Sequence, residues 1–126
     1  MIGYITIGAN DPEASGKFYD AVFGAIGHER KFRDGGWIGY GEKGQEAHSV
    51  YVCTPRDEKA ATFGNGSMIA FKAKSKHDVD AAHRAGVSHG GTDEGAPGPR
   101  PADSTSYYGA YLRDPVGNKI CVFHKT

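Results

Sequence analysis

The sequence has no excess of charge of either sign and no cluster of basic residues. Its 126 residues include 15 lysines and arginines and 15 aspartates and glutamates, so the formal charges cancel at neutral pH. Nucleic acids and anionic membranes bind proteins that carry a basic patch or stripe. We therefore expect neither partner, and we expect a small molecule as the ligand.

Long apolar runs are also missing. No segment approaches the roughly twenty apolar residues that a membrane-spanning helix needs. The first residues lack the charged and apolar regions of a secretory signal peptide. These absences predict a cytoplasmic protein that does not bind membranes.

Cysteine is scarce as well. Cys53 and Cys121 are far apart, and each lies in an apolar run without a Cys-x-x-Cys spacing. Zinc knuckles and redox pairs need paired cysteines. We therefore expect two reduced thiols that are partly buried.

The sequence does contain a pattern of secondary structure that occurs twice. Tyr4 to Gly8 is typical of a short strand, and Asp11 followed by Pro12 indicates the start of a helix that ends near Gly24. The glycine-broken segment from residue 26 to 53 then predicts three antiparallel strands, the last of them from His48 to Cys53.

The same order begins again at Met68, where a short apolar strand precedes Ser75, the expected cap of a second helix. We predict an α+β fold of two βαβββ modules that form a curved mixed sheet around a cavity, in one domain that spans residues 1–126. Module one is expected at about 1–55, a linker at about 56–66 and module two at about 67–126.

The end of the second module gives the strongest local signal. Two aromatic and β-branched runs between Ser106 and Lys125 flank a turn sequence at residues 114–118, which predicts a β-hairpin. The preceding segment, Gly90 to Ser106, is rich in glycine and proline. It is either a mobile lid or a solvated loop that carries one distorted strand, and the second reading is slightly favoured.

With these motifs the sequence resembles the vicinal oxygen chelate superfamily, which includes glyoxalases, bleomycin-resistance proteins and extradiol dioxygenases. The resemblance covers nearly the whole chain and rests on segments 18–24, 66–71, 91–98 and 107–118. It implies paired modules whose sheets curl around a cavity that holds a divalent metal. Modules of this family pair within a chain or across a dimer, and we expect a homodimer.

The resemblance also indicates where the metal ligands should lie. The matching positions are Tyr4, Tyr51, Met68 and Cys121. None is a histidine or a carboxylate, so we expect no metal and no other cofactor. Only His48 and His124 could rebuild a metal site from opposite strands, and both are predicted to point away from the cavity.

The residues that we expect to line the cavity are mostly aromatic. They are Tyr4, Tyr51, Met68, Tyr108, Tyr111, Cys121 and Phe123. Such walls suit a planar or apolar ligand, although tyrosine also favours strands in general. Arg100 and Arg113 could bind a carboxylate, but surface arginines are the commoner case. We assign no catalytic residue, since Cys121 has only Lys119 as an activating neighbour.

Two functions from different classes follow from the resemblance. One is a glyoxalase-like lyase or isomerase with a degenerate metal site, related to the dioxygenases of the family. The other is a protein without catalysis that sequesters a small molecule, as the bleomycin-resistance branch does.

Overall fold

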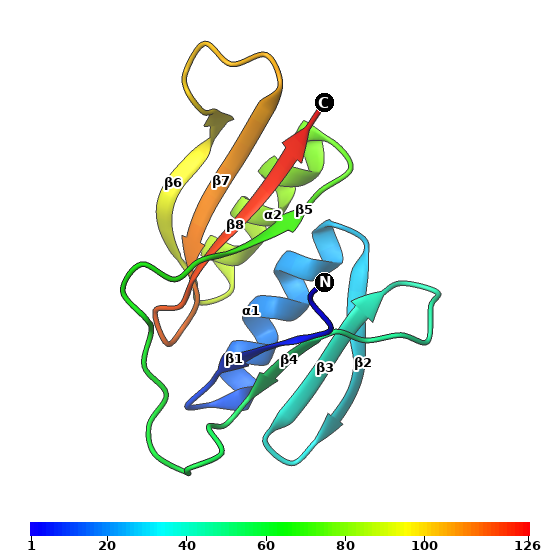
Figure 1. The fold of residues 1–126 in the computed structure, drawn as a ribbon, viewed down its shortest axis with the longest axis vertical. Coiled ribbons are helices and arrows are strands. Elements are labelled where there is room, and N and C mark those ends of the chain that lie inside the picture. The colour runs from blue at the N-terminus through cyan, green and yellow to red at the C-terminus, as the bar shows by residue number, and fades with distance from the viewer.

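The computed structural model describes all 126 residues and contains two four-stranded sheets, each with one helix (Figure 1). The first module consists of β1 (Ile5–Gly8), α1 (Pro12–Ala25), β2 (His28–Asp34), β3 (Trp37–Glu42) and β4 (Val50–Cys53). The second consists of β5 (Ile69–Lys72), α2 (Lys76–Ser88), β6 (Thr92–Pro99), β7 (Tyr107–Arg113) and β8 (Lys119–Lys125). The predicted α+β fold of two βαβββ modules is confirmed.

The two sheets have the same topology. Their strand orders are β1-β4-β3-β2 and β5-β8-β7-β6. In each sheet the first strand of the module pairs in parallel with the last, and the other neighbours are antiparallel. The first and last strands of each module therefore lie side by side.

Side-chain caps begin both helices where the sequence predicts them. The Asp11 carboxylate accepts hydrogen bonds from the backbone N–H groups of Glu13 and Ala14. The Ser75 hydroxyl accepts one from the N–H of Asp78. These bonds satisfy N–H groups that have no partner within the first turn of a helix.

A single hydrophobic core joins the two modules. Its 17 buried residues come from both helices and both sheets, and the helices lie behind their sheets in Figure 1. Gly86 of α2 lets the helices approach closely, because a Cβ there would lie 2.8 Å from Leu112 and 3.0 Å from Val22. Neither helix is long and apolar enough to span a membrane.

A buried carboxylate also links the modules. Asp114, in the turn between β7 and β8, accepts a hydrogen bond from the Tyr19 hydroxyl of α1 at 2.7 Å. Its other oxygen accepts the backbone N–H groups of Val116, Gly117 and Asn118, which fixes the predicted hairpin turn. The Asn118 side chain in turn donates to the carbonyl of Gly8 in the first module.

The proline-rich segment Gly90 to Ser106 contains β6, as the distorted-strand alternative predicts. Its pairing with β7 shifts register between Asp93 and Gly95 and again between Gly95 and Gly98. Between β4 and β5 the chain forms neither helix nor strand. There the Asn10 side chain holds it by donating to the carbonyl of Ala61 and accepting its N–H.

Candidate ligand-binding site

One face of each sheet packs against its helix, and we call the other its open face. Residues alternate between the two faces along each strand. In β8, Ile120 and Val122 belong to the hydrophobic core. Cys121 and Phe123 therefore lie on the open face of the second sheet. In β4 the same alternation places Val52 in the core and Tyr51 on the open face of the first sheet.

Aromatic rings surround Tyr51 on the first open face. The centroid of its ring lies 5.6 Å from that of Tyr4, 5.8 Å from Trp37 and 6.2 Å from Phe32. The His48 ring is also adjacent, with Nδ1 2.6 Å from the Tyr51 hydroxyl oxygen. Tyr4 and Trp37 are 66% and 41% exposed, so much of this aromatic cluster faces solvent.

A glycine makes room for this cluster. Gly39 of β3 lies directly opposite Tyr51 in the ladder. The ring of Phe32 lies across the space where a side chain would be, since a Cβ at Gly39 would come within 2.2 Å of it. The missing side chain thus lets an aromatic ring from β2 reach Tyr51.

A glycine also makes room for an aromatic ring on the second open face. Gly109 of β7 lies opposite Phe123, and a Cβ at Gly109 would lie 2.8 Å from the ring of Tyr107. That ring stacks on Phe123 with 5.7 Å between centroids. The Tyr107 hydroxyl oxygen lies 3.0 Å from the Tyr111 hydroxyl and 3.3 Å from Cys121 Sγ.

Two members of this hydrogen-bonded chain, the central Tyr107 and the terminal Cys121, are neutral at physiological pH. Burial, followed by the hydrogen bond to Cys121, raises the pKa of Tyr107 well above its ordinary value. Burial also raises the pKa of the Cys121 thiol, against the lowering effects of the two tyrosine hydroxyls, Arg100 and Lys119. The thiol is therefore a weak nucleophile in this environment.

The predicted cavity residues fall into separate groups. Tyr4 and Tyr51 meet on the first open face. Tyr111, Cys121 and Phe123 share the second open face through their common contacts with Tyr107. Met68 lines a groove of about 220 Å³ between the sheets, to which Thr6 and Lys119 also contribute.

Tyr108 lies on the opposite face from the other predicted residues. Its hydroxyl donates to the Asp80 carboxylate of α2 at 2.6 Å. Tyr107 is the tyrosine that belongs to the open face instead. Strand alternation could have identified it, because Tyr107 and Tyr111 are an even number of residues apart whereas Tyr108 and Tyr111 are not.

The two histidines considered as metal ligands also lie apart. His48 was expected to face away from the cavity, but it precedes β4 and contacts Tyr51. His124, in the other sheet, directs Nδ1 to the carbonyl of Ala73 at 3.1 Å. They therefore do not form a shared site.

The donors at the family's metal positions do not fit a divalent ion. The Tyr51 hydroxyl is engaged by His48, and Cys121 is a neutral thiol hydrogen-bonded to Tyr107. No group of three or more histidine, cysteine, aspartate or glutamate side chains is arranged to hold a metal ion. Hard divalent cations prefer carboxylate oxygens and borderline ones such as zinc also bind imidazole, and these positions have neither donor.

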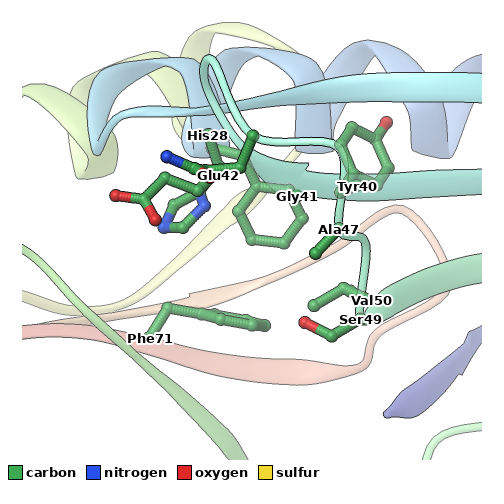
Figure 2. Close-up of a pocket in the computed structure, with 10 residues that line it drawn as sticks. His28, Tyr40, Gly41, Glu42, Ala47, Ser49, Val50 and Phe71 are labelled. Carbon is green, nitrogen blue, oxygen red and sulfur yellow. The ribbon is translucent and has the colours of Figure 1, made fainter.

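A second hollow, the inter-module cavity, has a volume of about 480 Å³ (Figure 2). Figure 2 shows the ring of Phe71 on one side and His28 and Glu42 close together on the other. Phe71 of β5 also contacts Phe23 of α1, with 4.9 Å between ring centroids. The full lining is Phe23, His28, Tyr40, Gly41, Glu42, Gln45, Ala47, Ser49, Val50 and Phe71.

Sequence reasoning did not anticipate the inter-module cavity, which includes none of the predicted site residues. Its walls come from both modules and lie on the helix side of the sheets, as the core residues Phe23 and Tyr40 indicate. Two of its lining residues, His28 and Glu42, are opposite each other in the β2–β3 ladder, a pairing that the sequence did not indicate.

Comparisons with known proteins agree with this architecture. The family model described as Glyoxalase/Bleomycin resistance protein/Dioxygenase superfamily matches residues 1–122. A glyoxalase/bleomycin resistance protein from Albidiferax ferrireducens T118 has 40% sequence identity and a TM-score of 0.87, with 98% of each chain covered. No curated protein matches the chain.

More distant solved structures share the fold. A glyoxalase-related enzyme from Fulvimarina pelagi has 22% identity and a TM-score of 0.74, with 99% of this chain and 88% of that chain covered. A lactoylglutathione lyase from Agrobacterium tumefaciens has 21% identity and a TM-score of 0.67, with 98% and 92% covered. At these identities the likeness concerns the fold alone.

Proposed function

Because the chain belongs to the Glyoxalase/Bleomycin resistance protein/Dioxygenase superfamily, we propose that it binds a small aromatic molecule on the open faces of its sheets. The aromatic cluster around Tyr51 is the observation that carries this proposal. Edge-on and tilted rings that stay accessible, such as Tyr4 and Trp37, suit a planar ligand. A cytoplasmic location remains a prediction from the sequence.

We further propose a homodimer in which the first open face of one protomer meets the second open face of its partner. The chain's own modules are joined through their helices, and this leaves Tyr4, Trp37 and Met68 exposed. Exposed apolar groups that lie close together are typical of interaction surfaces. Light scattering should find a dimer at micromolar concentration, and a monomer there would contradict the arrangement.

Sequestration is the better supported of the two function classes. The second open face presents the Tyr107 phenol and the Cys121 thiol in their neutral forms, and neither is an effective base at physiological pH. A protein built only to bind needs no such base. We therefore propose binding without turnover as the main function.

A lyase or isomerase remains the second candidate because of one contact. His48 lies 2.6 Å from the Tyr51 hydroxyl, and an imidazole at this position could transfer a proton to or from a bound ligand. Any ligand found by binding should therefore also be tested for turnover. Turnover that is lost in His48→Gln would favour the enzyme.

The experiment compares two sites within one protein. A thermal-shift screen of aromatic metabolites and antibiotics identifies a ligand, and calorimetry then measures its affinity for three variants. Trp37→Ala removes an exposed ring from the first open face, His28→Ala alters the inter-module cavity, and Val87→Ala is a matched truncation of an exposed apolar residue on α2.

We expect Trp37→Ala to weaken binding by about tenfold, which corresponds to one lost aromatic contact. His28→Ala and Val87→Ala should have little effect. If His28→Ala weakens binding and Trp37→Ala does not, the ligand occupies the inter-module cavity and the proposed site is wrong.

A further inference from the structure

Two cations on the second open face have no acidic partner. Arg100 and Lys119 lie over the ring of Tyr111, at 5.6 Å and 5.7 Å from its centroid. Neither takes part in any of the salt bridges of the chain. Because both are close to one ring, their electrostatic fields add on this part of the open face.

The acidic residues of the neighbouring strand β6 are already paired. Asp93 lies 2.8 Å from His83 of α2, and Glu94 accepts a hydrogen bond from Arg113 at 3.2 Å. Neither carboxylate forms an ion pair with Arg100 or Lys119. The second open face keeps a local positive charge although the whole chain has none.

The backbone of β6 holds the Arg100 guanidinium in place. The guanidinium donates hydrogen bonds to the carbonyl of Ala96 at 2.7 Å and to that of Pro99 at 3.2 Å. Glycine leaves space for it, since a Cβ at Gly98 would lie 3.0 Å from the guanidinium. The two bonds leave other N–H groups of the guanidinium free to bind an anion.

Lys119 reaches the same region from β8. It is two residues from Cys121 and shares its face of the strand. It also lines the groove between the sheets together with Met68. Its ammonium group therefore lies where the groove meets the aromatic surface of the second sheet.

We propose that the second open face selects aromatic ligands that carry an anionic group, such as a carboxylate, and binds that group with Arg100 and Lys119. This inference rests on the proposed binding function and adds a ligand class to it. The aromatic part of the ligand packs against Tyr107 and Phe123, while the anion lies toward the cations beside Tyr111. Two of the three protons of Tyr107, Tyr111 and Cys121 serve the hydrogen bonds of Tyr107 to Tyr111 and to Cys121, and the third, on the Tyr111 hydroxyl or the Cys121 thiol, is left to donate to the ligand.

The test uses pairs of probes that differ only in charge. Benzoate is compared with benzamide, and 4-hydroxybenzoate with 4-hydroxybenzamide, by calorimetry at low and high salt. Each acid should bind about tenfold more tightly than its amide, which is the effect of one charge-assisted contact. Added salt should reduce this preference because it screens exposed charges.

Three variants separate the proposed site from general surface charge. Lys119→Gln and Arg100→Gln should each weaken the binding of the acids and leave the amides unchanged. Lys76→Gln is the matched control, because Lys76 lies 5.7 Å over the ring of Tyr108 on the helix side of the same sheet. Lys76→Gln should change the affinity for neither the acids nor the amides. If Arg100→Gln does not fold, Lys119→Gln alone decides the test.

The outcomes distinguish this inference from the proposed function. Equal affinity for acids and amides overturns the anion site and leaves the aromatic site standing. An equal loss in Lys76→Gln assigns the preference to general surface charge and also overturns it. If no probe binds, the anion site is wrong, and if the wider screen of aromatic compounds also finds no ligand, the proposed function is wrong as well.

Discussion

The hydrogen bond between Tyr19 and Asp114 tests how the two modules are held together. Tyr19 is fully buried, and Asp114 is 3% exposed. In Tyr19→Phe, the oxygen of Asp114 that faced Tyr19 keeps only the side-chain amide of Asn118 as a donor. A hydrogen bond to a charged group contributes about 1.5–3 kcal/mol. We expect the free energy of unfolding to fall by about that amount.

Urea denaturation measures this change, with an unaltered slope showing that the folded state is otherwise the same. Tyr4→Phe is the matched control, because Tyr4 is 66% exposed and its hydroxyl has no partner within the chain. Asp114→Asn should destabilise more than Tyr19→Phe. The NH2 group of the new Asn side chain is a donor and would have to replace one of the two carboxylate oxygens. On one side it would face the backbone N–H groups of the turn, and on the other it would face the Asn118 amide and the Tyr19 hydroxyl. Among these groups only the Tyr19 oxygen can accept a hydrogen bond.

The pH dependence gives an independent check. Burial, and then the Asp114 carboxylate, raise the pKa of Tyr19 well above its ordinary value. A raised pKa contributes stability that is complete below the ordinary value of about 10 and is lost as the pH rises through the higher value of the folded state. The wild type should therefore lose more stability above pH 10 than Tyr19→Phe does. Two results together would refute the reasoning: a free energy of unfolding for Tyr19→Phe equal to that of Tyr4→Phe, and a loss of stability above about pH 10 equal to that of the wild type.

Three further predictions concern the open faces and the second helix. Gly109→Ala should destabilise the protein in urea by about 1–3 kcal/mol, because its Cβ would lie 2.8 Å from the ring of Tyr107; an unchanged midpoint would mean that the ring moves aside freely. Cys53 and Cys121 are both buried and should react with a thiol reagent only when urea unfolds the chain, so rapid labelling of native protein would contradict their placement. The hydrogen bond from His83 lowers the pKa of Asp93. The stabilisation from this bond is therefore present above the ordinary aspartate pKa of about 4 and is lost as the pH falls through the lower pKa of the folded state. The melting temperature of Asp93→Asn should therefore fall less in acid than that of the wild type.

Local chemistry made much of the fold predictable from the sequence. Asp11 and Ser75 act as caps through side-chain oxygens, which depends only on the next few residues. The turn at Asp114 likewise uses the carboxylate to bind N–H groups two to four positions along the chain. Features that a residue builds with its own neighbours are those that a sequence pattern can indicate.

The candidate site was harder to predict because it depends on register and on contacts between distant elements. Tyr107 and Tyr108 are adjacent and chemically identical, and only the position of the strand in its sheet decides which one faces Cys121. His48 reaches Tyr51 because β4 begins at Val50, two residues later than the predicted strand. Boundary shifts of this size change which face a side chain occupies.

The duplicated architecture explains why the two open faces resemble each other in shape and differ in chemistry. In each sheet a glycine, Gly39 or Gly109, lets an aromatic ring lie across the centre of the open face. Aromatic surface therefore arises twice, and pairing the two faces would enclose a planar ligand on both sides. The polar groups are not duplicated, because His48 adjoins the first face and the unpaired Lys119 the second. Such a pair of faces would hold an asymmetric ligand in one orientation, with its anionic end toward the second module.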